Sequence, residues 1–363
     1  MIRDVKDFTP EFLTDVFRRS LEDQSLEVER VTVAPLSLKT AHSAQLHRLH
    51  LTYLNEGHSG PKSVIAKLPD LSPEMVENCR IFQPGTKEEW FYRFAVPAGS
   101  IRTPRVYFGS ALRTTGEATL LLEDLGHLEA VTQVEEAPHD DIILALAELA
   151  RFHAKWGNAT GHEGFDELRD LVGDAAIGAA RVQQLFVEAW PLFVKNSRFN
   201  IPKEVNQLGE SLVEKGLSPE ALSCSGPNTL LHGDYRIDNL LFSDVSGIRN
   251  CIVLDWESVE IGCGMIDVAW LVAGCVPNLS AELELSMLSH YYHCLLKHGV
   301  TGYDFQTCFD DYRKCMIVQF VQGVLSGTIY EPETVSDADA RFATVIGSRF
   351  VEAAYRLRLQ NLM

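Results

Sequence analysis

Short runs of alternating apolar and polar residues fill the first third of the chain and predict β-strands. VERVTVAPL and AQLHRLHLTYL alternate with a period of two, and SVIAKLP is a third run of the same kind. The glycine-containing segment NEGHSGPK separates the last two runs, which predicts a hairpin. PRVYFGS and ATLLLEDLG are expected to form two more strands.

Apolar residues recur at helical spacing once among these strands, and this spacing dominates the chain after Gly126. GTKEEWFYRFAV places Trp90, Phe91 and Phe94 at helical spacing. HDDIILALAELARFHAKW is strongly amphipathic, and residues 165–225 and the C-terminal part are mostly helical in pattern. NLLF and IRNCIVLD flank a turn expected at Ser243–Gly247, which predicts a second hairpin.

These patterns predict an α+β protein with two lobes. The N-lobe, residues 1–124, is expected to hold a small mixed β-sheet with one main helix. The C-lobe, residues 125–363, is expected to be larger and mostly helical. A chain of 363 residues is too long for one ordinary core and suits such a division.

The net charge and the cysteines indicate which binding partners and which cellular compartment to expect. The formal net charge is −18, which repels nucleic acid and anionic lipid, so neither nucleic acid nor membrane is an expected partner. This charge is explained by an acidic surface that maintains solubility, or by an acidic cleft that recruits a cationic substrate. No apolar run is long enough to span a bilayer, and the N-terminus lacks a signal-peptide pattern. Eight scattered cysteines without a CxxC pair indicate a reducing, cytoplasmic compartment. The oligomeric state stays open.

The candidate chemistry is concentrated in His232-Gly233-Asp234, followed by Asn239, and in the later run Asp255-Trp256-Glu257. Phosphoryl transfer needs a carboxylate that orients the acceptor hydroxyl and oxygen ligands that hold Mg²⁺. The Asp-x4-Asn spacing provides a carboxylate and an amide oxygen on one short loop. The second hairpin is expected to return Asp255, at the end of a buried strand, to this loop. An Asp after a strand is also a common turn residue, and we expect His232 to brace the loop rather than to transfer protons.

Lys67 and the run Leu120–Leu125 are the candidates for nucleotide binding. Lys67 lies in an apolar strand and needs a partner, which Glu88 or Glu89 on the following helix provides. Lys67 is interpreted as a phosphate-binding residue, or alternatively as an edge-strand lysine that faces solvent. Leu120–Leu125 is interpreted as a strand whose end meets an adenine ring, with contacts at Glu123 and Leu125, or alternatively as a core strand.

At these residues the chain resembles the kinase-like phosphotransferases of small molecules, which include aminoglycoside phosphotransferases, choline kinases and ecdysteroid-kinase-like proteins. The similarity covers nearly the whole chain, and its most specific part is HGD-x4-N with DWE. It implies a two-lobed protein-kinase-like fold in which residues 1–124 bind the nucleotide and residues 125–363 carry the catalytic loop and the acceptor-substrate helices. It also implies an ATP- and Mg²⁺-dependent transfer of the γ-phosphate to a hydroxyl of a small acceptor. The implied roles are catalytic base for Asp234, Mg²⁺ ligands for Asn239 and Asp255, phosphate binding for Lys67, ion pairing with Lys67 for Glu88, and bracing of the loop for Asp267.

One departure from this group concerns the segment Pro35–Ala44, which contains no glycine where the group often has several. Glycine lets backbone N–H groups approach phosphates closely. The side chains of Ser37, Lys39, Thr40 and Ser43 are possible substitutes for such contacts.

Three other functions are compatible with parts of the sequence. The main alternative is a catalytically inactive nucleotide-binding scaffold. A protein kinase is disfavoured because Gly233 replaces an arginine of those enzymes and the segment from Asp255 to Asp267 is too short for a peptide-docking loop. A metal hydrolase lacks its HExxH motif. The sequence leaves the acceptor open. Four aromatic residues of the helical region are interpreted either as the lining of an apolar acceptor pocket or as ordinary core packing: Phe186, Trp190, Phe193 and Phe199.

Overall fold

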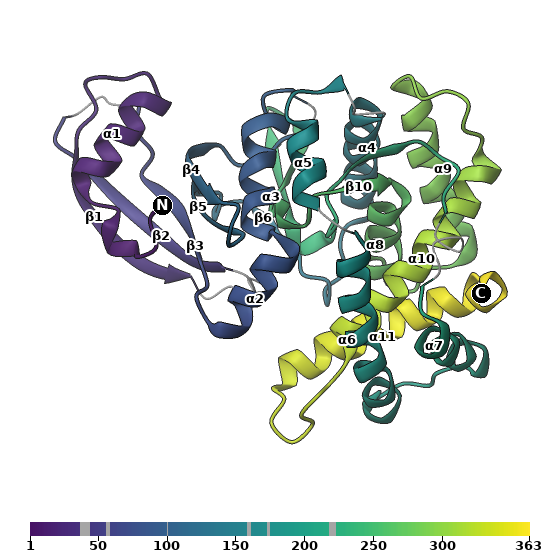
Figure 1. Ribbon diagram of the computed structural model, residues 1–363. Coiled ribbons are helices and arrows are strands. Elements are labelled where there is room, and N and C mark those ends of the chain that lie inside the picture. The colour runs from purple at the N-terminus through teal and green to yellow at the C-terminus, as the bar shows by residue number, and fades with distance from the viewer. Residues whose placement is uncertain (37–43, 56–58, 100, 158–160, 173–174, 218–222) are drawn as a thin grey trace. The chain divides into compact units, whose positions relative to one another are not determined.

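The computed structural model describes the chain except for residues 37–43, 56–58, 100, 158–160, 173–174 and 218–222. It divides into two compact units (Figure 1). The first unit comprises Met1–Leu128, Asp166–Gly173 and Val253–Val259, and the second comprises Glu129–Phe165, Asp174–Ile252 and Glu260–Met363. Among the described residues, no helix combines the length and the apolar character that crossing a membrane requires.

An antiparallel sheet of five strands forms the first unit, in the order β1-β2-β3-β5-β4. The hairpin expected from NEGHSGPK is confirmed, since β2 and β3 pair antiparallel. Lys67 in β3 pairs with Leu46 on one side and with Leu120 on the other, so its strand is central and the edge-strand interpretation is wrong. The strands are β1 (Val28–Leu36), β2 (Ala44–Tyr53), β3 (Ser63–Pro69), β4 (Val106–Leu112) and β5 (Glu117–Glu123).

Helix α1 (Pro10–Ser20), which the pattern of strands did not reveal, packs against this sheet (Figure 1). Thr9 Oγ1 accepts a hydrogen bond from the backbone N–H of Phe12 at 3.2 Å, and Pro10 occupies the first helical turn. Phe17 of α1 is fully buried in one cluster with Leu49 and Val64 of the sheet. The Thr-Pro pair was therefore the local signal for this helix.

The predicted helix around Trp90 is present, but Pro84 divides the region into α2 (Pro73–Phe82) and α3 (Pro84–Trp90). A single π-helical turn, Phe91–Ala95, follows α3. The ring of Phe91 stacks on Trp256 with centroids 3.6 Å apart and planes 7° from parallel. This stacking fixes the short helix Trp256–Ser258 against α3 and so sets the position of the adjoining Asp255.

The second unit is mostly helical. Strand β7 (Asn228–Leu231) pairs with β10 (Glu260–Cys263), and β6 (Glu129–Ala130), β8 (Leu240–Val245) and β9 (Ile248–Val253) form a small sheet. The helices are α4 (His139–Trp156), α6 (Ala175–Asn196), α7 (Lys203–Lys215), α8 (Met265–Cys275), α9 (Ala281–Lys297), α10 (Phe305–Gly327) and α11 (Asp337–Arg356), while α5 (Phe165–Val172) lies almost wholly in the first unit.

The second predicted hairpin is present, with its turn at the end of the expected range. Ser246 and Gly247 have φ of 53° and 78°, as a two-residue type I′ hairpin requires.

The aromatic residues Phe186, Trp190 and Phe193 of α6 are buried and stack on one another, so they form core packing. The small sheet lobe and the larger helical lobe confirm the predicted fold class.

Candidate functional site

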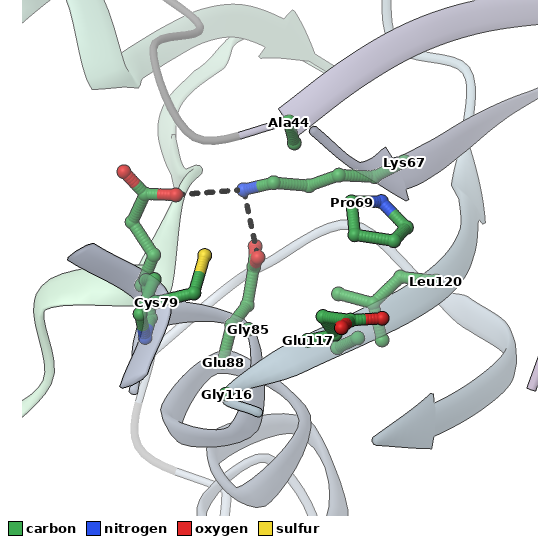
Figure 2. Close-up of a pocket in the computed structure, with 12 residues that line it drawn as sticks. Ala44, Lys67, Pro69, Cys79, Gly85, Glu88, Gly116, Glu117 and Leu120 are labelled. Atoms are coloured by element: carbon green, nitrogen blue, oxygen red, sulfur yellow. Dashed lines mark hydrogen bonds and ion pairs between the residues drawn. The ribbon is translucent and has the colours of Figure 1, made fainter. Parts of the chain in front are cut away.

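Four side chains of the first unit form what we call the lysine–carboxylate cluster: Lys67, Glu88, Asp255 and Glu257. Lys67 Nζ lies 2.6 Å from Asp255 Oδ1, 2.7 Å from Glu88 Oε2 and 3.5 Å from Glu257 Oε2. Figure 2 shows Lys67 extending from its strand toward Glu88 on α3. Strand β3, helix α3 and the segment after β9 thus each contribute part of one charged group.

Burial makes these charges interdependent. Burial alone would lower the pKa of Lys67, but the negative charges of Asp255, Glu88 and Glu257 outweigh it, and the pKa of Lys67 is raised well above its usual value. Burial raises the pKa of Glu88 to about 7, although the charge of Lys67 opposes this shift. Lys67 is therefore held as a cation, and burial disfavours the ionised form of Glu88.

The cluster contains one positive charge and three carboxylates, so a further cation would improve its balance of charge. Carboxylate oxygens of Glu88, Asp255 and Glu257 lie within 4.8 Å of one another. Glu88 is buried against Lys67, whereas about a quarter of each of the Asp255 and Glu257 side chains is exposed. An all-oxygen donor set fits a hard ion such as Mg²⁺, with Asp255 and Glu257 as the accessible ligands.

Asp255 has an unusual backbone conformation, with φ of 61° and ψ of 67° in the left-handed region. This region is uncommon for residues other than glycine and costs energy that the surrounding packing must supply. The backbone N–H of Val253 donates to the carbonyl of Arg102 at 2.9 Å, and Trp256 is buried against Phe91. These contacts on both sides of Asp255 aim its carboxylate at Lys67.

A pocket adjoins the cluster on the α3 side of the sheet (Figure 2). Lys67, Glu88 and Glu257 form its charged wall, and Leu120 and Pro69 belong to its apolar wall. Because its lining comes from the first unit alone, the pocket is a property of this unit.

The predicted adenine-binding run lies at the end of β5 in the same unit. Asp124 accepts two hydrogen bonds from Arg48, at 2.7 and 3.2 Å, and one from Ser63 Oγ at 2.6 Å. Glu123 Oε2 accepts from the backbone N–H of Arg105 at 3.1 Å, and the carbonyl of Leu125 accepts from the N–H of Leu128. Side-chain hydrogen bonds thus hold the chain where it leaves the sheet.

In the second unit, β7 leads directly into His232–Asn239, which we call the HGD loop. Asp267, fully buried in the first turn of α8, accepts hydrogen bonds from the backbone N–H groups of His232 and Gly233, both at 2.8 Å. Gly233 has φ of 83°, which favours glycine at this position. The loop is therefore anchored through its own backbone.

His232 lies inside this loop and is fully buried. Its Nδ1 accepts a hydrogen bond from the backbone N–H of Asp234 at 3.2 Å, and its ring packs edge-on against Tyr235. These contacts suit a bracing residue.

A second buried histidine, His153 of α4, lies 3.2 Å from Asp267 and 2.7 Å from the hydroxyl of Tyr291. Sequence reasoning did not single out His153, whose only signal was its place on the apolar face of a helix.

Asp234 is part of a compact polar group with Arg236 and Asn239. Asp234 Oδ2 accepts hydrogen bonds from Arg236 Nε at 3.0 Å and from Asn239 Nδ2 at 3.1 Å, while 29% of the side chain remains exposed. Because the amide nitrogen of Asn239 faces Asp234, its amide oxygen is the atom suited to a metal ion. Arg236 was not predicted, and neither was Glu257; each stands two residues after a predicted aspartate.

The predicted site residues therefore form two sets. Lys67, Glu88 and Asp255 meet in the first unit. Glu123 and Leu125 also belong to this unit. A second set is gathered in the second unit by the HGD loop and α8: His232, Asp234, Asn239 and Asp267. Residues 37–43 of the glycine-free segment, which include Ser37, Lys39, Thr40 and Ser43, lie outside the described residues.

Residues 40–301 match the Ecdysteroid kinase-like family. The chain belongs to this family. None of the curated protein sequences gives a significant match. The resemblance to kinase-like phosphotransferases of small molecules is thereby confirmed, and membership of the Ecdysteroid kinase-like family supports a phosphotransferase.

Solved structures share the fold of this Ecdysteroid kinase-like chain at low identity. Choline kinase from Cryptosporidium parvum Iowa II aligns with a TM-score of 0.52 and 13% identity over 96% of this chain and 95% of that one. Ethanolamine kinase from Plasmodium vivax aligns at 0.51 and 12% over 92% and 83%. A putative aminoglycoside phosphotransferase from Ralstonia eutropha JMP134 aligns at 0.50 and 16% over 98% of each chain. At such identities these similarities show the fold alone.

Proposed function

We propose that this protein is a kinase that transfers the γ-phosphate of ATP, with Mg²⁺, to a hydroxyl group of a small molecule. The observation that carries the proposal is the geometry of the HGD loop. There, a part-exposed Asp234 is held by Arg236 and Asn239, and its loop is anchored on a buried Asp267. A preoriented carboxylate beside an amide oxygen is what phosphoryl transfer to a hydroxyl requires.

In this proposal Asp234 orients the acceptor hydroxyl and accepts its proton. Arg236 and Asn239 both donate to Oδ2, which restricts rotation of the carboxylate. His232 and Asp267 keep the backbone of the loop in place. Since the proton leaves late in a loose transition state, a large part of the benefit comes from orientation.

The lysine–carboxylate cluster is assigned to the nucleotide and its metal ion. Lys67, held as a cation by Glu88, contacts the phosphates, and Asn239 and Asp255 are ligands of Mg²⁺, with Glu257 as an additional accessible carboxylate. Bound Mg²⁺ supplies neutralisation of the charge on the phosphates. Glu123 and Leu125 are assigned to the adenine. We assign residues 1–124 to nucleotide binding and 125–363 to catalysis and acceptor binding.

The acceptor is proposed to be a small hydroxyl-bearing molecule, and ethanolamine, choline and aminoglycosides are the acceptors that the names of the fold relatives suggest. All eight cysteines are free thiols. Reduced cysteines are typical of the cytoplasm, which is the compartment we propose.

The test is acceptor-dependent release of ADP from ATP, measured across a panel of amino alcohols, aminoglycosides and hydroxylated sterols. We expect at least one acceptor to raise ADP release in the parent protein and not in Asp234→Asn. A matched control is Asp244→Asn, which changes an exposed aspartate of the same unit and should retain the parent rate. Nucleotide binding without turnover on any acceptor would instead support the inactive scaffold.

A further inference from the structure

Three cysteine thiols converge in the second unit, apart from the residues assigned to phosphoryl transfer. We call Cys224, Cys263 and Cys315 the thiol cluster. Their Sγ atoms all lie within 4.8 Å of one another, and those of Cys224 and Cys315 are 3.6 Å apart. Cys263 and Cys315 are buried, whereas Cys224 is half-buried. Solvent thus has access to the cluster from the Cys224 side.

The cluster lies at the end of the β7–β10 ladder that is remote from the HGD loop. Cys263 pairs with Asn228, the first residue of β7, whereas Leu231 at the other end of β7 pairs with Glu260 and precedes His232. The thiols come from the segment before β7, from β10 and from α10. Nothing in the proposed kinase chemistry uses them.

The geometry resembles that of metal ligands more than that of a disulfide. Sulfurs bound tetrahedrally to one Zn²⁺ at about 2.3 Å lie roughly 3.8 Å apart, close to the 3.6 Å between Cys224 and Cys315. A disulfide would need about 2.05 Å. The distance between Cys224 and Cys315 therefore already suits two thiolates of one ion, and Cys263 Sγ lies within 4.8 Å of both.

A buried carboxylate holds the cluster in this arrangement. Asp311, fully buried on α10 one turn before Cys315, accepts hydrogen bonds from the backbone N–H groups of Ser225 and Gly226 at 2.9 and 2.8 Å. The hydroxyl of Tyr303 donates to the same carboxylate at 3.0 Å. The segment that carries Cys224 is thus tied to the helix that carries Cys315.

The donor set consists of three sulfur atoms. Sulfur is a soft ligand, which favours ions such as Zn²⁺ over Mg²⁺.

We propose that Cys224, Cys263 and Cys315 form a binding site for a thiophilic d¹⁰ metal ion, with Zn²⁺ as the divalent ion used to test it. The ion takes three thiolates, the three thiol protons leave to solvent, and a fourth position stays open on the Cys224 side. Such an ion would link the segment before β7 to β10 and α10 and would stabilise the second unit. The proposal does not depend on the kinase assignment.

The test uses full-length protein that has been reduced and freed of metal, titrated with Zn²⁺ and analysed for bound metal after dialysis. We expect about one equivalent per chain, and loss of that equivalent in Cys224→Ser and Cys315→Ser. Co²⁺ should give the charge-transfer absorption of a thiolate-bound ion in the parent protein and not in Cys224→Ser or Cys315→Ser. Cys294→Ser removes a part-exposed thiol outside the cluster and should retain the full equivalent.

A second measurement guards against variants that fail to fold. In the parent protein, bound Zn²⁺ should slow alkylation of Cys224 and raise the temperature of unfolding, while alkylation of Cys294 should be unchanged. Absence of Zn²⁺ uptake by the reduced parent would overturn the proposal. Uptake that survives Cys224→Ser, or that is lost in Cys294→Ser, would also overturn it. A further contrary result would combine two observations. Oxidised glutathione would join Cys224 to Cys315 in a disulfide, and the same protein would bind no metal after reduction.

Discussion

In the lysine–carboxylate cluster, four side chains from three distant segments are held by charge, whereas in the HGD loop neighbouring residues are held by hydrogen bonds. Lys67 meets Asp255 across 188 positions of sequence, but Asn239 meets Asp234 across five. The cluster has three carboxylates for one lysine. The loop has its backbone N–H groups satisfied by one buried aspartate.

This difference indicates how each region responds to change. A loop anchored through its backbone keeps its geometry without a ligand, so substitutions there should affect the rate of the chemical step. A cluster with an excess of like charge depends on cations, so substitutions there should affect nucleotide binding, metal dependence and the effect of pH. The predictions below test this division, beginning with the largest expected effect.

Asp234→Asn should cause the largest loss. The change keeps the size of the side chain and removes the charge that is proposed to accept the hydroxyl proton, so kcat should fall by about 10²- to 10⁴-fold. ATP affinity should change little, because Asp234 is assigned to the acceptor. Acceptor-dependent ADP release and ATP binding, measured on both proteins, check this. Full kcat in the variant would remove Asp234 from the chemistry.

Asp267→Asn should destabilise the second unit. The fully buried carboxylate accepts two backbone hydrogen bonds at 2.8 Å, and an amide replaces one acceptor oxygen with a donor. We expect a loss of about 2–3 kcal/mol in the free energy of unfolding. Denaturant unfolding measures this loss, with Asp244→Asn as the exposed control. Equal stability of the two variants would mean that Asp267 does not brace the loop.

Lys67→Ala should weaken nucleotide binding by about 10- to 100-fold, since it removes the charge-assisted contacts to phosphate that we propose for Lys67. It also leaves Glu88, Asp255 and Glu257 without their lysine. Isothermal titration with Mg·ATP checks the affinity, and circular dichroism checks the fold. Lys62→Ala, an exposed lysine just before the same strand, is the control and should bind normally. Unchanged affinity in Lys67→Ala would restrict Lys67 to a structural role.

Removal of Mg²⁺ should weaken ATP binding by about tenfold, because Asp255 and Glu257 repel the phosphates when no cation lies between them. Titration of ATP with and without a chelator measures this effect. In Asp255→Asn the dependence on Mg²⁺ should shrink. If the dependence is the same in the parent and in this variant, Asp255 is not a metal ligand.

The smallest expected effect is the contribution of Glu88 to the pH dependence of the free energy of unfolding. Burial raises the pKa of Glu88 to about 7, above its usual 4.5. The folded protein therefore binds a proton that the unfolded chain releases between about pH 4.5 and 7, and stability falls as pH rises through this window. Relative to Glu88→Gln, the free energy of unfolding of the parent should fall across this window.

Denaturant unfolding at several pH values measures this difference, with the exposed Glu77→Gln as control. A difference between parent and Glu88→Gln that does not vary with pH would show that Glu88 is ionised throughout the window.

The sequence by itself determined the elements and residues that depend on near neighbours. The hairpin of β2 and β3, helix α4 and the hairpin of β8 and β9 were predictable because periodicity and turn residues act over a few positions. The motif of the HGD loop was visible for the same reason, since the spacing from Asp234 to Asn239 is a local property.

Only the tertiary structure decided which distant side chains meet. The pairing of Lys67 with Asp255 depends on a central strand and on the stacking of Phe91 with Trp256, which no local pattern encodes. The ion pair of Arg236 with Asp234 and the contact of His153 with Asp267 were missed, as was the convergence of three scattered cysteines. Spacing along the chain predicts contacts within one element, whereas packing between elements determines which remote charges and thiols become neighbours.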